Sequence, residues 1–411
     1  MKKLFWIFIA SPVLFSARIW AQETVKDTVF LIPFADTVLL DEVVVKAHKT
    51  IPMNNRWSDL QPVDLVTVAG ANGNLYKALE TLPGTQIQGE SGRLLVRGGS
   101  SDETQTYIDG MHVLNPYTST AENIPARGRY SPFMFSGINL STGGHSQEYG
   151  EALSAVLPLE TKDNSQINKV GISPSTVGIG GGGNHAFRNA SLALNLDYQN
   201  LALYNKVYPG RIDFKKPYQM FSGATQFRYT PSGSSVFKIY VGYDRTDYSN
   251  YTDNNRYLFC LGENNVYLNS TFRTAISGGW EWFSGMAYSL FDRKVDGAVT
   301  EGDHWCEKQA ELHFKTKLSK KFHPTFRMDV GFESFLRWYE TRYSQVSVAD
   351  TKEISPTIEA VFGTVSYYPV ENLKAELSFR TEYASLARKI NFSPCLSFSY
   401  SWCDLVLSAT A

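Results

Sequence analysis

The residues that most suggest ligand chemistry are the glycines of Gly178-Ile-Gly-Gly-Gly-Gly183, which have the G-x-G-x-x-G spacing of a dinucleotide site. That spacing binds a pyrophosphate when it opens a helix, and Asp197 follows at a distance suited to a ribose hydroxyl. However, Ser191 to Leu196 alternates as a strand, so the helix N-terminus that would bind the phosphates is missing. We therefore interpret the glycines as part of a strand to which the wall of the preceding domain comes close.

The other reactive residue types lack the spacing of a catalytic or metal site. The sequence has no H-E-x-x-H pair, P-loop lysine or nucleophile elbow, so we predict a protein that is not an enzyme and holds no cofactor or metal. Only His304 is close to a cysteine, which disfavours zinc. The spacing favours free thiols or thiols paired in loops, and one or two disulfides stay open for an exported chain. The cysteines are Cys260, Cys306, Cys395 and Cys403.

The N-terminal residues are typical of a secretory signal, which we predict over residues 1–21. Two lysines precede the apolar stretch Leu4 to Phe15, and a cleavage site follows Ala21. The stretch is short for a membrane-spanning helix, although an uncleaved anchor is the alternative. No later apolar run has spanning length, so the sequence predicts an exported protein without a transmembrane helix.

Net charge and aromatic content bear on whether the protein binds nucleic acid and whether it lies in a membrane. A net charge of −1 over 411 residues gives no electrostatic reason to expect nucleic acid as a partner. Aromatic residues make up 14% of the chain, with 23 Tyr and 25 Phe. Such enrichment suits the aromatic girdles of a membrane β-barrel, although extracellular all-β domains can share it.

Glycine-punctuated segments predict a small α+β domain, which we place over residues 51–163. Apolar residues at helical spacing stop at Pro83-Gly84. The β-prone Leu94 to Val96 precedes a pair of glycines that release the backbone from side-chain sterics. Asp109-Gly110 between apolar flanks predicts a two-residue hairpin turn. The residues at helical spacing are Leu75, Ala78, Leu79 and Leu82.

Residues 164–411, which begin with a polar joint, predict a succession of alternating strands. In Ala310 to Leu318 the apolar residues point one way, and Glu311, His313, Lys315 and Lys317 point the other. The same alternation predicts strands over Phe326 to Phe332, Lys374 to Tyr383 and Phe237 to Tyr243. Turn signals lie at residues 231–234, 318–321 and 369–372.

This pattern favours a transmembrane antiparallel β-barrel over a soluble β-sandwich. Charges crowd one face of the strands, which suits a filled lumen, and the apolar face then meets lipid. Strands of about ten residues also fit a tilted membrane crossing. We count about eleven strands from Lys169 to Cys403, against about 22 in plugged outer-membrane transporters. Only about half a barrel is therefore expected, from a fragment or a truncated gene.

Four motifs in this order resemble the plug domain of the TonB-dependent outer-membrane receptors, in their Bacteroidetes-type form. They are NLYKALETLPG (74–84), LLVRGG (94–99), YIDGM (107–111) and STGGHSQEYGEALSAVLPLETKD (141–163). Ahead of them, in the segment of residues 22–50, LDEVVV (40–45) resembles a TonB box. Three valines after an acidic pair make an extended strand that can add to the sheet edge of an energising partner. An ordinary strand of a leading domain is the alternative.

The resemblance implies roles for particular residues. TonB contact is implied for Leu40, Asp41, Glu42, Val43, Val44 and Val45. A plug framework is implied for Arg97, Gly98, Asp109, Gly110, Tyr149 and Gly150, and we expect Arg97 and Asp109 to pair with charges of the lumen wall. His145 and Glu148 are interpreted as part of a solvated loop. The polar loop 115–129 supplies candidates for substrate contact, namely Asn115, Tyr117, Arg127 and Arg129.

The function implied is active uptake of a bulky nutrient (an iron chelate, cobalamin or an oligosaccharide) across the outer membrane, with the plug as a gate. The implied partners are the TonB-type energising complex, outer-membrane lipid, the extracellular ligand and, in the starch-utilisation branch, a surface lipoprotein. Against that branch, residues 22–39 are too short for its extra leading domain. The alternatives are a surface adhesin or structural β-protein that transports nothing, and an inactive truncated receptor.

Overall fold

The computed structural model describes residues 57–60, 65, 67–68, 70–71, 73–87, 91–119, 125–162, 168–209, 213–252, 257–345, 348–370, 372–402 and 405–410. All of them belong to the second of two units into which the chain divides, residues 50–411. The predicted signal peptide, the segment Leu40 to Val45 and Cys403 lie outside the described residues.

The N-terminal part of the described chain is a small α+β domain built on a five-stranded sheet of order β1-β6-β7-β4-β5. Its helix α2 (Leu75–Leu79) begins after Asn74, whose side chain accepts the Tyr76 N–H, and buries its apolar residues. Strands β2 and β3 form a separate pair. The predicted strand at Leu94 is confirmed, and so is the predicted helix, although it ends at Leu79 and Leu82 lies in the turn that follows. The strands are β1 Trp57–Leu60, β2 Thr85–Ile87, β3 Leu94–Val96, β4 Thr104–Ile108, β5 Met111–His112, β6 Phe135–Ser141 and β7 Ala155–Thr161.

The predicted hairpin turn at Asp109-Gly110 is also confirmed. It joins β4 to β5, and both turn residues have positive φ, 50° at Asp109 and 83° at Gly110. Two left-handed residues in a row are the geometry of a tight hairpin turn, which asparagine, aspartate and glycine tolerate best. The turn places Asp109 at the end of the domain's sheet.

The rest of the described chain is a 14-stranded antiparallel sheet in which nearly every strand pairs with its sequence neighbours. Strand β17 pairs with β16 beside β18, and β8 and β21 are the edges. The strands are β8 Lys169–Ser175, β9 Gly178–Ala186, β10 Ala190–Asn200, β11 Phe214–Ser232, β12 Ser235–Thr252, β13 Tyr257–Ile276, β14 Trp280–Asp296, β15 His304–His323, β16 Phe326–Gln345, β17 Val348–Ile354, β18 Thr357–Val370, β19 Leu373–Ala384, β20 Lys389–Trp402 and β21 Leu405–Thr410. The short helices are α3 Ala202–Val207, η2 Ser101–Glu103, η3 Pro132–Met134 and η4 Ser277–Gly279.

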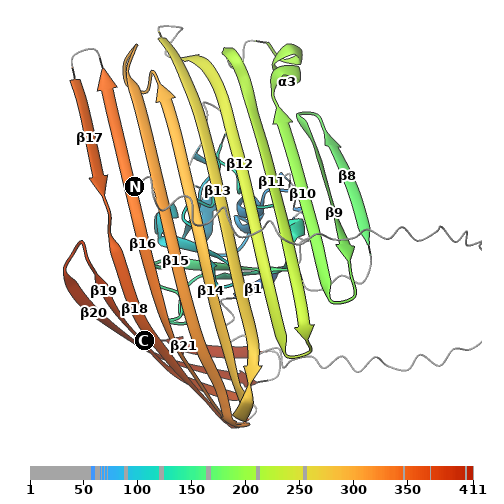
Figure 1. Ribbon diagram of the computed structural model, residues 1–411, viewed down its shortest axis with the longest axis vertical. Coiled ribbons are helices and arrows are strands. Elements are labelled where there is room, and N and C mark those ends of the chain that lie inside the picture. Colours follow the sequence, from blue (N-terminus) through green and yellow to red (C-terminus); the bar gives the residue numbers. More distant parts are fainter. Residues whose placement is uncertain are drawn as a thin grey trace, which may run out of the picture. The chain divides into compact units, whose positions relative to one another are not determined.

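Long strands dominate this sheet. Figure 1 shows β11 to β16 side by side as long tilted arrows, with the strands of the N-terminal domain behind them. Each of these six strands has 17 to 20 residues, far beyond the length that a globular sheet requires. That length exceeds one membrane crossing, which takes about ten residues. No helix among the described residues is apolar and long enough to cross a bilayer.

Two expectations about the strands are wrong. Between Lys169 and Cys403 the described residues form 13 strands of this sheet, β8 to β20, where the alternation predicted about eleven. The turn predicted at residues 318–321 lies inside β15, which continues to His323. Ser319 and the following lysines are polar because they occupy the end of a strand that extends beyond the apolar band. The turns predicted at 231–234 and 369–372 are confirmed, because β11 ends at Ser232 and β18 at Val370.

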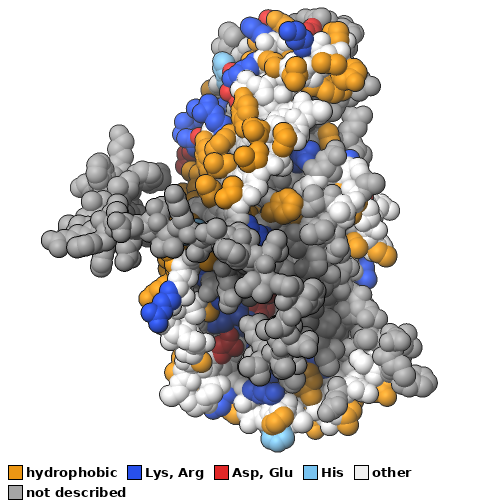
Figure 2. All heavy atoms as spheres, turned by 90° about the vertical axis from the view of Figure 1, so that its right-hand side faces the viewer, with side chains coloured by type: hydrophobic (Ala, Val, Ile, Leu, Met, Phe, Trp, Pro, Cys, Tyr) orange, Lys and Arg blue, Asp and Glu red, His pale blue; other side chains and the backbone are white. Residues whose placement is uncertain are grey.

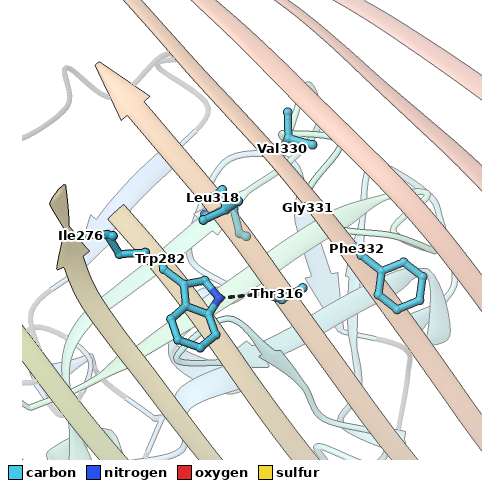
Figure 3. A pocket seen from close by; sticks show the side chains of 8 residues that line it. Ile276, Trp282, Thr316, Leu318, Val330, Gly331 and Phe332 are labelled. Carbon is cyan, nitrogen blue, oxygen red and sulfur yellow. Dashed lines mark hydrogen bonds between the residues drawn. The ribbon is translucent and has the colours of Figure 1, made fainter. Parts of the chain in front are cut away.

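The predicted division of the strands into two faces is confirmed. On β15, Glu311, His313 and Lys315 are at most 1% exposed, whereas Phe314 and Leu318 are 40% and 43% exposed. On the outward face Trp282, Leu318 and Phe332 line a hollow of about 310 Å³, and the Trp282 indole donates to Thr316 Oγ1 at 3.0 Å (Figure 3). Hydrophobic side chains also gather on the face seen in Figure 2. On β10 the exposed ones are Leu192, Leu194, Leu196 and Tyr198.

The glycine run is a strand, as interpreted from the sequence. Residues Gly178 to Ala186 form β9 between β8 and β10. A Cβ on Gly178 would lie 2.1 Å from the Tyr198 carbonyl oxygen, and one on Gly183 would lie 2.6 Å from that of Lys169. The close approach therefore comes from the two neighbouring strands, and the expectation that the N-terminal domain causes it is wrong.

Candidate functional site

The inward face of the large sheet meets the N-terminal domain in one continuous core. Tyr130 and Phe135 of the domain pack with Tyr240 and Tyr267 of the sheet, and all four side chains are at most 3% exposed. The Tyr267 hydroxyl donates to the Met111 carbonyl oxygen at 3.2 Å. The domain is thus fixed to the strands by apolar packing, and polar contacts beside this core determine how it could be released.

His112, at the end of β5, makes several buried polar contacts with the sheet. Its Nδ1 lies 2.6 Å from Glu311 Oε1, and its Nε2 lies 2.7 Å from Gln105 Oε1. Its backbone N–H donates to His313 Nδ1 at 3.0 Å. The other ring nitrogen of His313 lies 2.9 Å from Glu333 Oε1. A buried hydrogen-bonded chain therefore runs from the domain into two adjacent strands, β15 and β16.

The segment of residues 142–154, between β6 and β7, is held to the same strands by two carboxylates. Glu148 accepts from Lys317 Nζ at 2.7 Å and lies 3.2 Å from Lys315 Nζ. Glu151 receives both terminal nitrogens of Arg337, at 2.9 and 2.5 Å. The expectation of a solvated loop at Glu148 is therefore wrong, since the inward charges of β15 complete its surroundings. We call this segment the carboxylate segment.

The charge state of Glu148 follows from these contacts. Burial alone would raise the pKa of its carboxyl, but the ion pairs with Lys317 and Lys315 outweigh burial and lower that pKa to about 2. The carboxylate is therefore ionised at any physiological pH. His145 lies three residues earlier. Burial lowers the pKa of its imidazole and so favours the uncharged form.

The predicted framework residues occupy different environments. Asp109 accepts from Lys238 Nζ of β12 at 3.0 Å and from the Thr161 hydroxyl at 2.6 Å, so it does pair with a charge of the sheet. Arg97 is exposed and forms no ion pair with any described residue. Gly98 beside it is exposed with φ of 79°, and Gly110 completes the hairpin turn.

Tyr149 and Gly150 belong to the carboxylate segment and are packed against the sheet. The ring of Tyr149 lies 4.8 Å from that of Tyr107, and Lys315 Nζ lies 5.2 Å from its centre. The Gly150 carbonyl accepts the Tyr107 hydroxyl at 3.1 Å. A Cβ on Gly150 would lie 2.3 Å from Arg380 Nη2, so the glycine allows this close approach.

The predicted substrate contacts separate into two pairs. Asn115 and Tyr117 line a pocket of about 580 Å³ between the domain and strands β14 to β16. Arg129 is buried and its Nε donates to Asp244 of β12 at 2.7 Å. Arg127 does not line this pocket, and burial lowers the pKa of its guanidinium.

Two smaller cavities lie on the other side of the carboxylate segment. Glu151 lines the 580 Å³ pocket, whereas Glu148 lines cavities of about 220 and 440 Å³. The pocket contains Arg293 and Glu307, near the strand ends that long loops (201–213 and 297–303) connect. The smaller cavities contain Lys317, Arg327 and Lys238, nearer the short turns. The segment thus separates the long-loop side from the short-turn side.

Sequence reasoning missed Glu151, Arg337 and His112. Arg337 could have been found, because it continues the inward alternation of β16 that Arg327 and Asp329 begin. Glu151 and His112 could not, because nothing local indicates that they face partners 186 and 199 residues away.

Comparison with known proteins agrees with this architecture. Residues 65–156 match the family model of the TonB-dependent receptor plug domain. No curated protein matches the chain. Among solved structures it is similar to the ferric enterobactin receptor PfeA of Pseudomonas aeruginosa, with 13% identity, a TM-score of 0.63, and coverage of 87% of this chain and 61% of that one.

Two further structures are similar at the same level. The copper transporter OprC has 11% identity and a TM-score of 0.67, with coverage of 87% of this chain and 62% of that one. The siderophore receptor PirA of Acinetobacter baumannii has 13% identity and a TM-score of 0.65, with coverage of 90% and 62%. At such identities the likeness shows the fold, and the chain spans about three fifths of the length of these proteins.

The family model and the fold point to the same group of proteins, which are receptors and transporters rather than enzymes and reside in the outer membrane as β-barrels. The N-terminal domain is the plug and the large sheet is barrel wall. Residues 65–156 thus carry the plug domain of the TonB-dependent receptors, and the chain as a whole shares the fold of solved outer-membrane receptors and transporters.

Proposed function

We propose that the protein is an active transporter of a bulky nutrient and that the carboxylate segment is part of its gate. The observation that carries this proposal is the position of that segment between the 580 Å³ pocket and the two smaller cavities. Outer-membrane barrels have short periplasmic turns and long extracellular loops, so the large pocket opens toward the cell exterior. A ligand in that pocket is separated from the periplasmic side by Glu148, Glu151 and the residues between them.

The energetics suit a gate that stays closed at rest. Two ion pairs hold the segment, Glu148 with Lys317 and Glu151 with Arg337, and their side chains are only 10–28% exposed. Partly buried pairs are screened much less by salt and solvent than surface pairs, so both favour the closed form. Thermal motion alone therefore opens it rarely. Force applied through residues 40–45 by an inner-membrane TonB complex would shift this two-state equilibrium toward the open form.

The first experiment separates transport from mere binding at the cell surface. Deleting Asp41 to Val45 removes the strand offered to the energising partner, so uptake is expected to stop while ligand binding stays unchanged. A deletion of five residues within 24–36 is the matched control and should transport normally. Uptake that continues without Asp41 to Val45 would contradict the proposal and favour an adhesin or structural protein.

The second experiment tests the gate itself. In a background with the native cysteines replaced by serine, Glu148→Cys and Lys317→Cys are joined by a short thiol-reactive crosslinker that reductant cleaves. Uptake should stop on crosslinking and return on reduction, because the segment can no longer leave β15. The control joins two exposed positions within the sheet, Asp296→Cys of β14 and His304→Cys of β15, whose side chains lie 2.6 Å apart, and crosslinking there should not affect uptake. Full transport by the crosslinked Glu148 and Lys317 variant would overturn this gate.

A further inference from the structure

The charges that line the large pocket are balanced and already paired. Arg337 bonds with Glu151 and Glu311, the latter at 2.6 Å. Arg293 lies 2.9 Å from Glu263 and 3.7 Å from Glu307. The remaining lining cation, Arg93, lies 3.7 Å from Asp102. An anionic ligand needs a cation that is not already neutralised, because a buried charge must be paired. Among the described walls, Arg293 and Arg337 are neutralised in this way, and only Arg93 has a pair that is exposed to solvent.

What the pocket does offer is uncharged hydrogen-bonding capacity. Three amide side chains line it, those of Gln105, Asn115 and Gln309, and one N–H of each is bonded within the protein. Each amide keeps a second N–H for a ligand. The wall also contains the Thr104 hydroxyl, which is in a residue only 5% exposed and has no hydrogen-bond partner. Hydroxyl groups of a ligand both donate and accept, so they match such a surface.

A row of apolar side chains lies directly above this pocket on the lumen face. Cross-strand pairing joins Tyr248 to Leu261, Leu261 to Val295, Val295 to Trp305 and Trp305 to Tyr343. Tyr218 extends the row, with its ring 5.7 Å from that of Tyr248. Trp305 and Tyr343 are only partly buried, with ring centres 6.2 Å apart. We call these residues the aromatic row.

The aromatic row is unusual for its place. The lumen face of an outer-membrane barrel is polar, and the next row toward the plug contains Glu263, Arg293 and Glu307. Val295 and Trp305 are each two positions further along the same strands, so they face the lumen too. Most of the row is buried in a cluster that also packs against Leu201 and Phe214, so Trp305 and Tyr343 supply its open aromatic surface. Aromatic surface beside a few polar groups is the usual composition of a ligand site.

From these features we infer that the pocket and the aromatic row together bind an uncharged polyhydroxylated ligand, an oligosaccharide, in preference to an anionic metal chelate. Sugar rings have apolar C–H faces that stack on Trp305 and Tyr343, and hydroxyl edges that bond with the amides, Thr104 and Glu307. This inference rests on the proposed function, because it names the substrate class of the same transporter.

The test measures binding to the full chain in outer-membrane vesicles. The probes are neutral hexasaccharides (malto-, cello-, manno-, xylo- and chito-oligomers), a ferric tris-catecholate, cobalamin and an uncharged hexapeptide. At least one oligosaccharide should bind, with an affinity that is constant between 50 and 500 mM salt, since no net charge is recognised. Binding of the chelate, cobalamin or peptide alone, or of no probe, would overturn the inference.

Matched tryptophan variants locate the site. Trp305→Ala should weaken oligosaccharide binding about tenfold or more, because it removes a stacking surface. Trp338→Ala, on the outward face of β16 and 44% exposed, is the control and should leave affinity unchanged. Equal effects of the two would contradict the site. If the chelate is taken up and that uptake requires Asp41 to Val45, the inference fails and the proposed function stands. If an oligosaccharide binds but its uptake does not require Asp41 to Val45, the proposed function fails and the inference stands.

Discussion

The lumen face of β14 to β16 has two neighbouring regions with opposite chemistry. Near the plug, Glu311, Lys315 and Arg337 are buried in ion pairs with plug residues. Toward the long loops, Trp305 and Tyr343 present half-buried aromatic surface. The first region satisfies its polar groups within the protein and therefore holds the plug. The second leaves aromatic surface and hydrogen-bonding groups available to a ligand. The same alternating pattern thus builds a closed contact and an open one a few residues apart.

The largest effect is expected from Arg337→Ala in the closed region. The change leaves Glu311 and Glu151 without their guanidinium, and we expect the free energy of unfolding to fall by about 3–5 kcal/mol. Chemical denaturation in detergent measures it. Arg245→Ala, whose guanidinium is exposed and 3.9 Å from Asp247, is the control and should change stability by less than about 1 kcal/mol. Equal losses would mean that the buried pairing has no special role.

A smaller effect is expected from Glu148→Gln. The amide keeps the shape of the side chain but loses the charge opposite Lys315 and Lys317, so the segment should open more often without energy input. Passive entry of a large antibiotic into cells should rise. Glu353→Gln, on the exposed β17, should leave entry at the wild-type level. An unchanged permeability for Glu148→Gln would show that this contact does not limit opening.

The pH dependence of that contact has a definite sign. Because the pKa of Glu148 is lowered from its ordinary value of 4.5 to about 2 in the folded protein, its stabilisation is present above pH 4.5. It is lost as pH falls toward 2. The stability difference between wild type and Glu148→Gln should therefore be constant at neutral and mildly acidic pH and should shrink between about pH 4.5 and 2. Thermal unfolding at a series of pH values measures this difference, and one that grows on acidification would be inconsistent with the contact.

The smallest effect concerns the hairpin that positions Asp109. Gly110→Ala puts a side chain at φ of 83°, which costs about 1–2 kcal/mol. The added Cβ would also lie 3.4 Å from the Phe283 ring. Gly262→Ala, in β13 with open space around its Cβ position, is the matched control and should be neutral within about 0.5 kcal/mol. A neutral Gly110→Ala would show that the turn relaxes without disturbing the plug.

Much of the fold was predictable because its signals are local. The alternation at Ala310 to Leu318 assigns each side chain to a face, and the hairpin at Asp109-Gly110 follows from the two turn residues alone. The errors also have local causes. The polar end of β15 has the composition of a turn, and the glycine run has close neighbours that only strand pairing defines.

The site was less predictable, because its contacts join distant parts of the chain. Glu151 meets Arg337 across 186 residues, and His112 meets Glu311 across 199. No periodic pattern specifies such pairs, since each depends on how the plug is placed against the strands. Of the candidate substrate contacts, Asn115 and Tyr117 line the large pocket, whereas Arg129 is bonded to Asp244.

Local patterns in the chain are enough to specify an alternating wall with one apolar and one charged face, preceded by a small glycine-rich domain. Those properties follow from side-chain periodicity and turn chemistry, which act over a few residues. Which inward charges hold the plug, and which inward positions stay open to a ligand, is known from the folded protein alone. The difference depends on which inward residues the plug contacts. Those contacts join segments that are far apart in the sequence and meet only when the chain folds.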